Sequence, residues 1–253
     1  MELHPLATRF GGVAGNYERG RPGYPPAVAG AVMAELGLAP GDPVADLAAG
    51  TGKLTRALLA AGLDVVGVEP LDEMREVLAG HVGEERAIAG VAESIPLPDA
   101  SQRAVTVADG FHWFDAPAAL ADIARVLAPG GSLVLLSTIP DWSGASWAHE
   151  LGSLIEEMRP EHPYFDGPSW RESLAAAGGW SEPRELRVTV NRPADPEGIP
   201  DYLVSMSWVA ALDEESRREM LTRAAELVSA GETPDELPVH FRIALARLEG
   251  SSR

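Results

Sequence analysis

Cysteine is absent from the 253 residues of this chain, which excludes disulfide bonds and thiolate chemistry. Lysine is nearly absent too, because Lys53 is its one occurrence and arginine supplies the other basic residues. No apolar run approaches the roughly 20 residues that a membrane-spanning helix needs. The first residues, Met1 to Pro5, show neither the basic nor the apolar region of a signal peptide. We therefore expect no membrane partner and a cytoplasmic location.

Positive charge is also scarce. The 38 acidic residues outnumber the 20 basic ones, which gives a formal net charge of −18. Such a surface repels nucleic acids at long range, and we find no basic stripe to offset it, so no nucleic-acid partner is expected. Hydrophobic residues make up 45% of the chain, which is typical of a globular core, and the length fits a single domain over residues 1–253.

The most informative motif is a glycine turn between an apolar segment and a helical one, within Val44–Thr55. A dinucleotide-binding turn has a third glycine, which is missing after Gly50 and Gly52. A phosphate-binding loop needs Ser or Thr directly after Gly-Lys, but Leu54 follows Lys53 here. The turn therefore lets a ligand approach the backbone without being built around phosphate.

A carboxylate, Glu69, ends the next apolar segment, within Asp64–Pro70. A carboxylate accepts hydrogen bonds from two hydroxyl groups, which suits a ribose diol. Together the turn and Glu69 predict a site for a nucleoside without phosphate, and S-adenosylmethionine is the leading member of that class.

Apolar segments alternate with helical patterns over the first half of the chain. This order predicts a doubly wound α/β fold with a parallel sheet, whose ligands bind at the carboxyl ends of the strands. Strands are expected at 43–48, 63–68, 86–90, 104–108 and 132–137, and helices at 26–38, 52–61, 72–79 and 116–127, with Asp72 as an N-cap.

The ends of the chain follow other patterns. Residues 1–26 are rich in Gly, Pro and Arg and predict an irregular arm. After Thr138, tryptophans such as Trp142 fall among Pro and Gly. Helices are expected there at 147–158, 169–177, 199–212 and 214–229, and a sixth strand at 186–190. Residues 239–248 fit a strand or a helix, and we favour a strand.

Several motifs together resemble class I S-adenosylmethionine-dependent methyltransferases, in the bacterial small-molecule branch related to trans-aconitate methyltransferases. The resemblance covers the whole chain. Besides the glycine turn and Glu69, it rests on Phe10 with Tyr17 and Arg21–Pro25, on Val91–Asp99, on Gly110–Phe114, on Val126–Gly131 and on Ser205–Trp208.

The resemblance implies a Rossmann-like, seven-stranded sheet with an antiparallel last strand. It also implies helical insertions that form a cap over the substrate, which we place at 139–182 and 196–236. The chain departs from the family at Ala48, where the motif normally has glycine. A methyl group there narrows the space near the methionine part of the cofactor.

The resemblance also assigns roles at the predicted cofactor site. Asp46 orders the turn, Glu69 binds the ribose, Ala92 and Glu93 read the adenine, and Asp109 lies where cofactor and substrate meet. Tyr17 and Arg21 fold over the cofactor. The remaining predicted contacts are Ala48, Gly50, Thr51, Gly52, Leu54, Pro70, Met74 and Phe111.

His112 and Trp113 are the candidate catalytic residues. A neutral imidazole at His112 accepts a proton from an attacking oxygen or nitrogen, whereas a carboxylate acceptor needs no base. Trp113 offers an aromatic face to the sulfonium charge. We expect a small-molecule acceptor, S-adenosylhomocysteine as the second product, no metal, and a monomer or homodimer.

Three alternatives remain open on the sequence. The pocket of an adenosyl-binding enzyme with this fold can catalyse a rearrangement or cyclisation instead of methyl transfer. The chain can also be an inactive binding subunit, which only Ala48 favours. A nicotinamide oxidoreductase is disfavoured by the missing third glycine.

Overall fold

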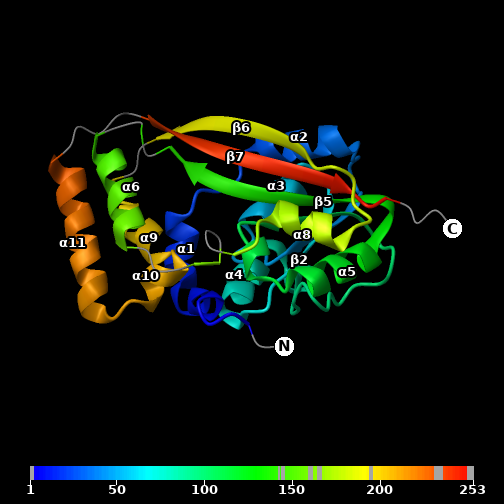
Figure 1. Cartoon of the computed structure of the whole chain (residues 1–253), viewed down its shortest axis with the longest axis horizontal. Coiled ribbons are helices and arrows are strands. Elements are labelled where there is room, and N and C mark those ends of the chain that lie inside the picture. The colour runs from blue at the N-terminus through cyan, green and yellow to red at the C-terminus, as the bar shows by residue number, and fades with distance from the viewer. Residues whose placement is uncertain are drawn as a thin grey trace. The chain divides into compact units, whose positions relative to one another are not determined.

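The computed structural model describes residues 3–141, 143, 146–158, 162–163, 167–193, 196–230 and 236–249. Trp142, part of the aromatic pattern noted above, lies outside these residues. The strands form one mixed sheet of seven, in the order β3-β2-β1-β4-β5-β7-β6. The arrows of β5 and β7 point in opposite directions (Figure 1), so the last strand is antiparallel. Both the sheet and the strand at 239–248 are confirmed.

The elements alternate through the first half as expected (Figure 1). The strands are β1 (Pro43–Leu47), β2 (Asp64–Val68), β3 (Ala87–Ile88), β4 (Gln102–Ala108), β5 (Leu127–Pro140), β6 (Arg184–Pro193) and β7 (Glu236–Arg247). The helices are α1 (Ala14–Gly20), α2 (Pro26–Leu36), α3 (Lys53–Ala60), α4 (Asp72–Val82), α5 (Ala116–Val126), α6 (Ser146–Met158), α8 (Trp170–Ala177), α9 (Ile199–Val204), α10 (Ser207–Ala211) and α11 (Glu214–Ala230). Short 3-10 helices span Ala7–Val13, Glu84–Arg86 and Phe111–Trp113.

The central strand β1 is apolar because neighbours cover it on both edges and both faces. It pairs in parallel with β2, where Ala45 lies opposite Val66, and with β4, where Ala45 lies opposite Val105. Leu47 is completely buried. Strands buried in this way read as continuous apolar runs, which is why the sequence located them well.

The chain divides into two compact units. Unit 2 comprises residues 23–138, 163–188 and 241–253. Its core packs the inner strands of the sheet against α5, and the buried Leu174 of α8 belongs to the same core. The segment 163–182 of the predicted cap region therefore lies in unit 2.

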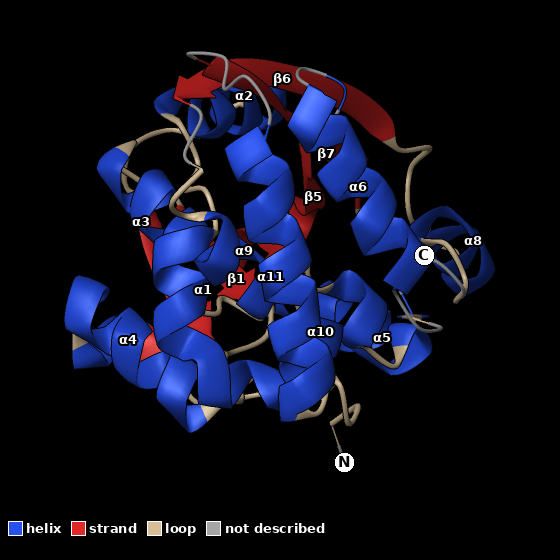
Figure 2. Ribbon diagram, turned by 90° about the vertical axis from the view of Figure 1, so that its left-hand side faces the viewer, coloured by secondary structure: helices blue, strands red, loops and turns tan. Residues whose placement is uncertain are grey.

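Unit 1 comprises residues 1–22, 139–162 and 189–240. Helices α6 and α11 lie side by side in it, as Figure 2 shows. Trp147, Leu203 and Met220 are buried in a separate hydrophobic core of this unit.

The expectation of an irregular N-terminal arm is wrong. Residues 7–13 form a 3-10 helix and α1 follows directly. Gly20, which weakens the helical signal, is required by packing: a Cβ on it would lie 2.3 Å from the backbone nitrogen of Tyr202 in α9. Tertiary contact between α1 and α9 thus overrides low local propensity.

Three smaller expectations are also corrected. The helix predicted at 199–212 is two helices, because the chain leaves the helical conformation at Met206. Asp72 does not cap α4; the N-cap is Leu71, and the Asp72 side chain pairs with Arg75 instead. The third strand is only two residues long. None of the described helices is long and apolar enough to cross a membrane.

Candidate active site

The carboxyl ends of β1 and β4 lie side by side in unit 2, at the point where the strand order reverses. Strands β2 and β3 follow β1 on one side of this point, and β4 and β5 lie on the other. Ligands of open parallel sheets bind at such a point.

The β1–α3 turn has an unusual backbone. Gly50 and Gly52 have φ angles of 57° and 83°, and Ala48 has a φ of 49°. Glycine adopts the left-handed region freely, whereas alanine is strained there. Strain of this kind concentrates at functional sites.

Glu69 closes the turn from the neighbouring strand. Its carboxylate accepts hydrogen bonds from the amide N–H of Gly50 at 2.9 Å and from that of Leu71 at 2.9 Å. The residue is only 4% exposed, and this burial raises the pKa of its carboxyl to about 7, although the Leu71 and Gly50 amides favour the charged form. The structure places this carboxylate beside the glycine turn, through a bond to Gly50 that the sequence did not predict; its role at a ribose stays a prediction.

Asp46 is a second buried carboxylate below the same turn. It accepts hydrogen bonds from the hydroxyl groups of Thr55 at 2.6 Å and Thr106 at 2.8 Å. Burial raises its pKa to about 6, while both hydroxyl groups lower it. Asp46 thus ties β1 to α3 and β4 through side-chain hydroxyls, and a contact with the methionine part of a cofactor stays a prediction.

The electrostatics of the turn disfavour a phosphate ligand. A pyrophosphate on a glycine turn needs free amide N–H groups and a positive environment. Here the Gly50 amide already binds the Glu69 carboxylate, and Asp46 adds further negative character. The arrangement suits a neutral or cationic nucleoside.

Asp109, at the end of β4, lies in a hydrogen-bond network. Its φ is 52°, and its carboxylate accepts the Thr138 amide at 3.0 Å and the Tyr24 hydroxyl at 3.4 Å. The Thr138 hydroxyl donates in turn to the Tyr24 oxygen at 3.2 Å. The sequence analysis named Asp109 but not its partners Tyr24 and Thr138, because nothing in their spacing links them, and the role of Asp109 at a cofactor stays a prediction.

Ala92 and Glu93 lie on the connection between β3 and β4. Ala92 is 4% exposed, and the half-buried Glu93 accepts a hydrogen bond from the backbone N–H of Asp115 at 2.8 Å. Asp115 is the N-cap of α5. The predicted adenine-reading segment is therefore attached to the start of that helix.

His112 and Trp113 follow β4 in a 3-10 helix. Both are half-buried, and their ring centroids lie 4.5 Å apart at an angle of 48°. Phe111 packs edge-on against Phe114 at 5.8 Å. The two candidate catalytic residues therefore stand together near the end of β4.

The other predicted cofactor residues are distributed as follows. The side chains of Thr51 in the turn, Leu54 in α3 and Met74 in α4 are buried, and Pro70 directly follows Glu69. Tyr17 and Arg21 belong to unit 1, where the Arg21 guanidinium lies 5.7 Å from the centroid of the Tyr17 ring. Their role at a cofactor stays a prediction. In the described part of the chain, no three His, Asp or Glu side chains gather as metal ligands.

Comparison with known proteins identifies the family. A family model described as a methyltransferase domain matches residues 45–135. An uncharacterized methyltransferase of Mycobacterium tuberculosis is 35% identical over 224 residues, 88% of this chain and 87% of that protein. A demethylmenaquinone methyltransferase of Thermus thermophilus is 40% identical over 167 residues, 56% of this chain and 76% of that protein.

The fold comparison agrees. The structure of a proposed type II methyltransferase from Anaeromyxobacter dehalogenans gives a TM-score of 0.63 at 23% identity, over 90% of this chain and 98% of that one. The chain belongs to the methyltransferase family, which confirms the resemblance noted in the sequence.

Proposed function

We propose that this methyltransferase transfers a methyl group from S-adenosylmethionine to an oxygen, nitrogen or carboxylate of a small molecule. The observation that carries the proposal is the Glu69 carboxylate, buried beside the glycine turn and bonded to the Gly50 amide. It occupies an amide N–H that a bound pyrophosphate would use, and its oxygens lie where a ribose diol is expected.

The residues at the turn fit this cofactor. S-Adenosylmethionine carries a positive sulfonium, and two buried carboxylates, Asp46 and Glu69, favour such a charge. We assign Glu69 to the ribose, Ala92 and Glu93 to the adenine, and the turn at Ala48 to the methionine part. Asp109, Tyr17 and Arg21 complete the proposed contacts.

The bound sulfonium supplies an electrophilic methyl group, so the protein's main task is to hold the acceptor in line with it. Correct placement lowers such a barrier by several kcal/mol, up to about 7–11. For an acceptor that loses a proton, we assign His112 as the base, with Trp113 beside it.

We infer the acceptor class from the net charge of the chain and from its sequence similarity to a named methyltransferase. A net charge of −18 opposes a nucleic-acid acceptor. The Thermus thermophilus relative is named for demethylmenaquinone, a small molecule. We propose that residues 139–182 and 196–236 form the cap that selects the acceptor, in a cytoplasmic monomer or homodimer.

Calorimetric titration tests the cofactor. We expect saturable binding of S-adenosylmethionine and S-adenosylhomocysteine to the wild type, and at least tenfold weaker binding to Glu69→Ala, since a charged hydrogen-bond partner of the ribose is lost. Glu73→Ala, which removes an exposed carboxylate on α4, is the matched control and should bind like the wild type.

Two results contradict the proposal. Tight binding of NADH without either adenosyl ligand would indicate an oxidoreductase. A product of unchanged mass, formed from an acceptor in the presence of the cofactor, would indicate a rearrangement or cyclisation, because only methylation adds the mass of a methyl group.

A further inference from the structure

The segment Ile95–Asp99 begins two residues after Glu93, the second of the proposed adenine contacts Ala92 and Glu93. It lies on the long connection between β3 and β4, which contains only an isolated bridge between Val91 and Ser94. A connection with so little regular structure needs other contacts to fix its backbone.

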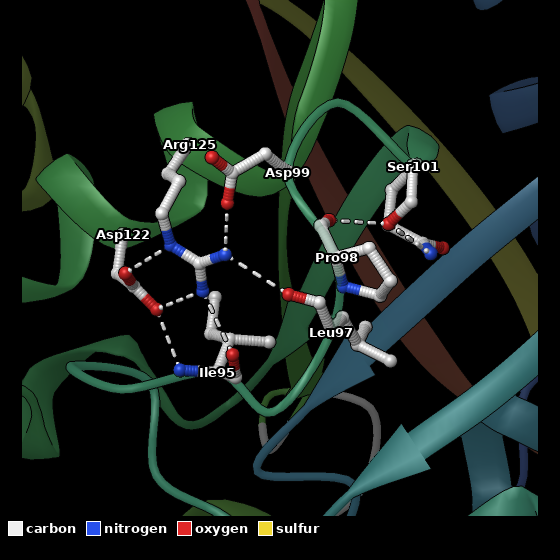
Figure 3. A network of polar contacts seen from close by, with 8 residues as sticks. Ile95, Leu97, Pro98, Asp99, Ser101, Asp122 and Arg125 are labelled. Carbon is white, nitrogen blue, oxygen red and sulfur yellow. Dashed lines mark hydrogen bonds and ion pairs between the residues drawn. The ribbon is translucent and has the colours of Figure 1, made fainter.

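Arg125, near the end of α5, supplies these contacts (Figure 3). Its guanidinium donates to the carbonyl oxygens of Ile95 at 2.8 Å and Leu97 at 2.9 Å, and to the Asp99 carboxylate at 2.7 Å. Two further bonds, at 2.7 and 2.9 Å, go to Asp122. An arginine has five N–H donors, so these five bonds use them all.

Asp122, one turn before Arg125 on α5, acts in two ways. Its bidentate pairing aims the guanidinium at the segment. One of its oxygens also accepts the backbone N–H of Ile95 at 2.5 Å. The Arg125–Asp122 pair thus binds both the donor and the acceptor groups of Ile95.

The same helix holds the connection at its other end. The backbone N–H of Asp115, the N-cap of α5, donates to the Glu93 carboxylate. Between these two anchors, α5 buries Ala119, Leu120 and Ile123 in the core of unit 2. Both Glu93 and Ile95 are therefore held by the same helix.

We propose that Arg125 is a positioning residue for adenine recognition, which acts by fixing the backbone at Ala92 and Glu93 through Ile95 and Leu97. The inference rests on the proposed cofactor. Reading the edge of a base requires its hydrogen-bonding partners to be held within about 0.5 Å, so a loosened segment loses discrimination as well as affinity.

The experiment compares S-adenosylhomocysteine with S-inosylhomocysteine, in which an oxo group replaces the adenine amino group. We expect the wild type to prefer the adenine ligand. Arg125→Met should bind S-adenosylhomocysteine about tenfold more weakly and lose most of this preference, while Arg125→Lys should fall between the two. Thermal melting checks that every variant is folded at the titration temperature.

Arg86→Met is the matched control. The Arg86 side chain is similarly exposed and binds a smaller set of the same groups, the Asp64 carboxylate and the Val65 carbonyl, at the amino end of β2. It should keep the wild-type preference. If Arg125→Met does not fold, Asp99→Asn removes the charge of one partner only and should reduce the preference less.

The outcomes separate the two hypotheses. No binding of either ligand to the wild type would overturn the proposed function. Binding by the wild type with a preference that folded Arg125 variants retain, or with no preference at all, would overturn the positioning role alone.

Discussion

The Cβ of Ala48 lies 3.0 Å from the position that a side chain on Gly110 would occupy. Ala48 thus lies close to the Gly110 backbone, where the segments after β1 and β4 come together at the point of strand-order reversal. Ala48 and Asp109, the residue before Gly110, are also two of the three non-glycine residues with a positive φ in the described part of the chain.

Ala48→Gly should relieve backbone strain and widen the site. Left-handed alanine costs about 1–2 kcal/mol, of which the greater freedom of glycine in the unfolded chain offsets roughly half. We expect unfolding free energy to rise by up to about 1 kcal/mol and S-adenosylmethionine to bind a few-fold more tightly, measured by urea denaturation and calorimetry.

Ala100→Gly is the control for this change, because exposed Ala100 has a φ of 52° away from the turn. It should gain similar stability without tighter cofactor binding. Equal affinity in both variants would show that the methyl group of Ala48 does not restrict the site.

Gly52→Ala should destabilise the protein. Gly52 has a φ of 83°, and a Cβ there would lie 2.4 Å from Leu78 Cδ1. Strain and overpacking together should cost about 2–4 kcal/mol in urea denaturation. Gly30→Ala, on α2 with nothing within 4 Å of its added Cβ, should instead be neutral or stabilise by about 0.5–1 kcal/mol. Similar losses in both variants would rule out the steric explanation.

Stability should fall as the pH rises from about 4 to about 7. Burial raises the pKa of Glu69 from 4.5 to about 7 and that of Asp46 from 3.8 to about 6. The folded state therefore binds the carboxyl protons of Glu69 and Asp46 more tightly than the unfolded chain does. The resulting contribution to folding stability is complete below the unfolded pKa values, and it is lost as the pH rises through the folded pKa values.

Glu69→Gln should flatten this dependence, because the amide has no proton to lose. Urea denaturation at several pH values measures the slope of stability against pH. Glu73→Gln changes an exposed carboxylate four residues after Glu69 and should keep the wild-type slope. An unchanged slope in Glu69→Gln would mean that this carboxyl does not titrate in the range.

His112→Asn tests the proposed base. With an acceptor that loses a proton, kcat should fall by about 10²–10⁴-fold while cofactor affinity is retained. His81→Asn, at an exposed position on α4, should keep full kcat. Full activity in His112→Asn would instead favour an acceptor that attacks as an anion without a base.

The sequence located the parallel strands and the glycine turn because both leave local signals, apolar runs and Gly50 with Gly52. It missed α1 because glycines obscure the pattern, and close packing of Gly20 on Tyr202 stabilises the helix instead. The sequence also missed the break between α9 and α10, because the helical spacing of apolar residues continues through Ser205. In the structure the buried Ser205 hydroxyl donates to the Tyr202 carbonyl just before the two helices separate.

The polar networks were beyond sequence reasoning for a related reason. Arg125 has an aspartate three residues before it, which reads as an ordinary exposed pair on a helix. Its bonds to Ile95, Leu97 and Asp99 depend on how the connection between β3 and β4 folds against α5. The same holds for Tyr24 and Asp109, 85 residues apart.

Unit 1 is built from three separate stretches of chain, and this has a consequence for synthesis. Asn16 of α1 binds Asp201 of α9, 185 residues later. At roughly 5–20 residues per second, a ribosome needs on the order of 10–40 s to make that interval. During this time α1 has no α9 to pack against, so the surface of α1 that α9 covers in the folded chain stays exposed until residues near Asp201 have been made.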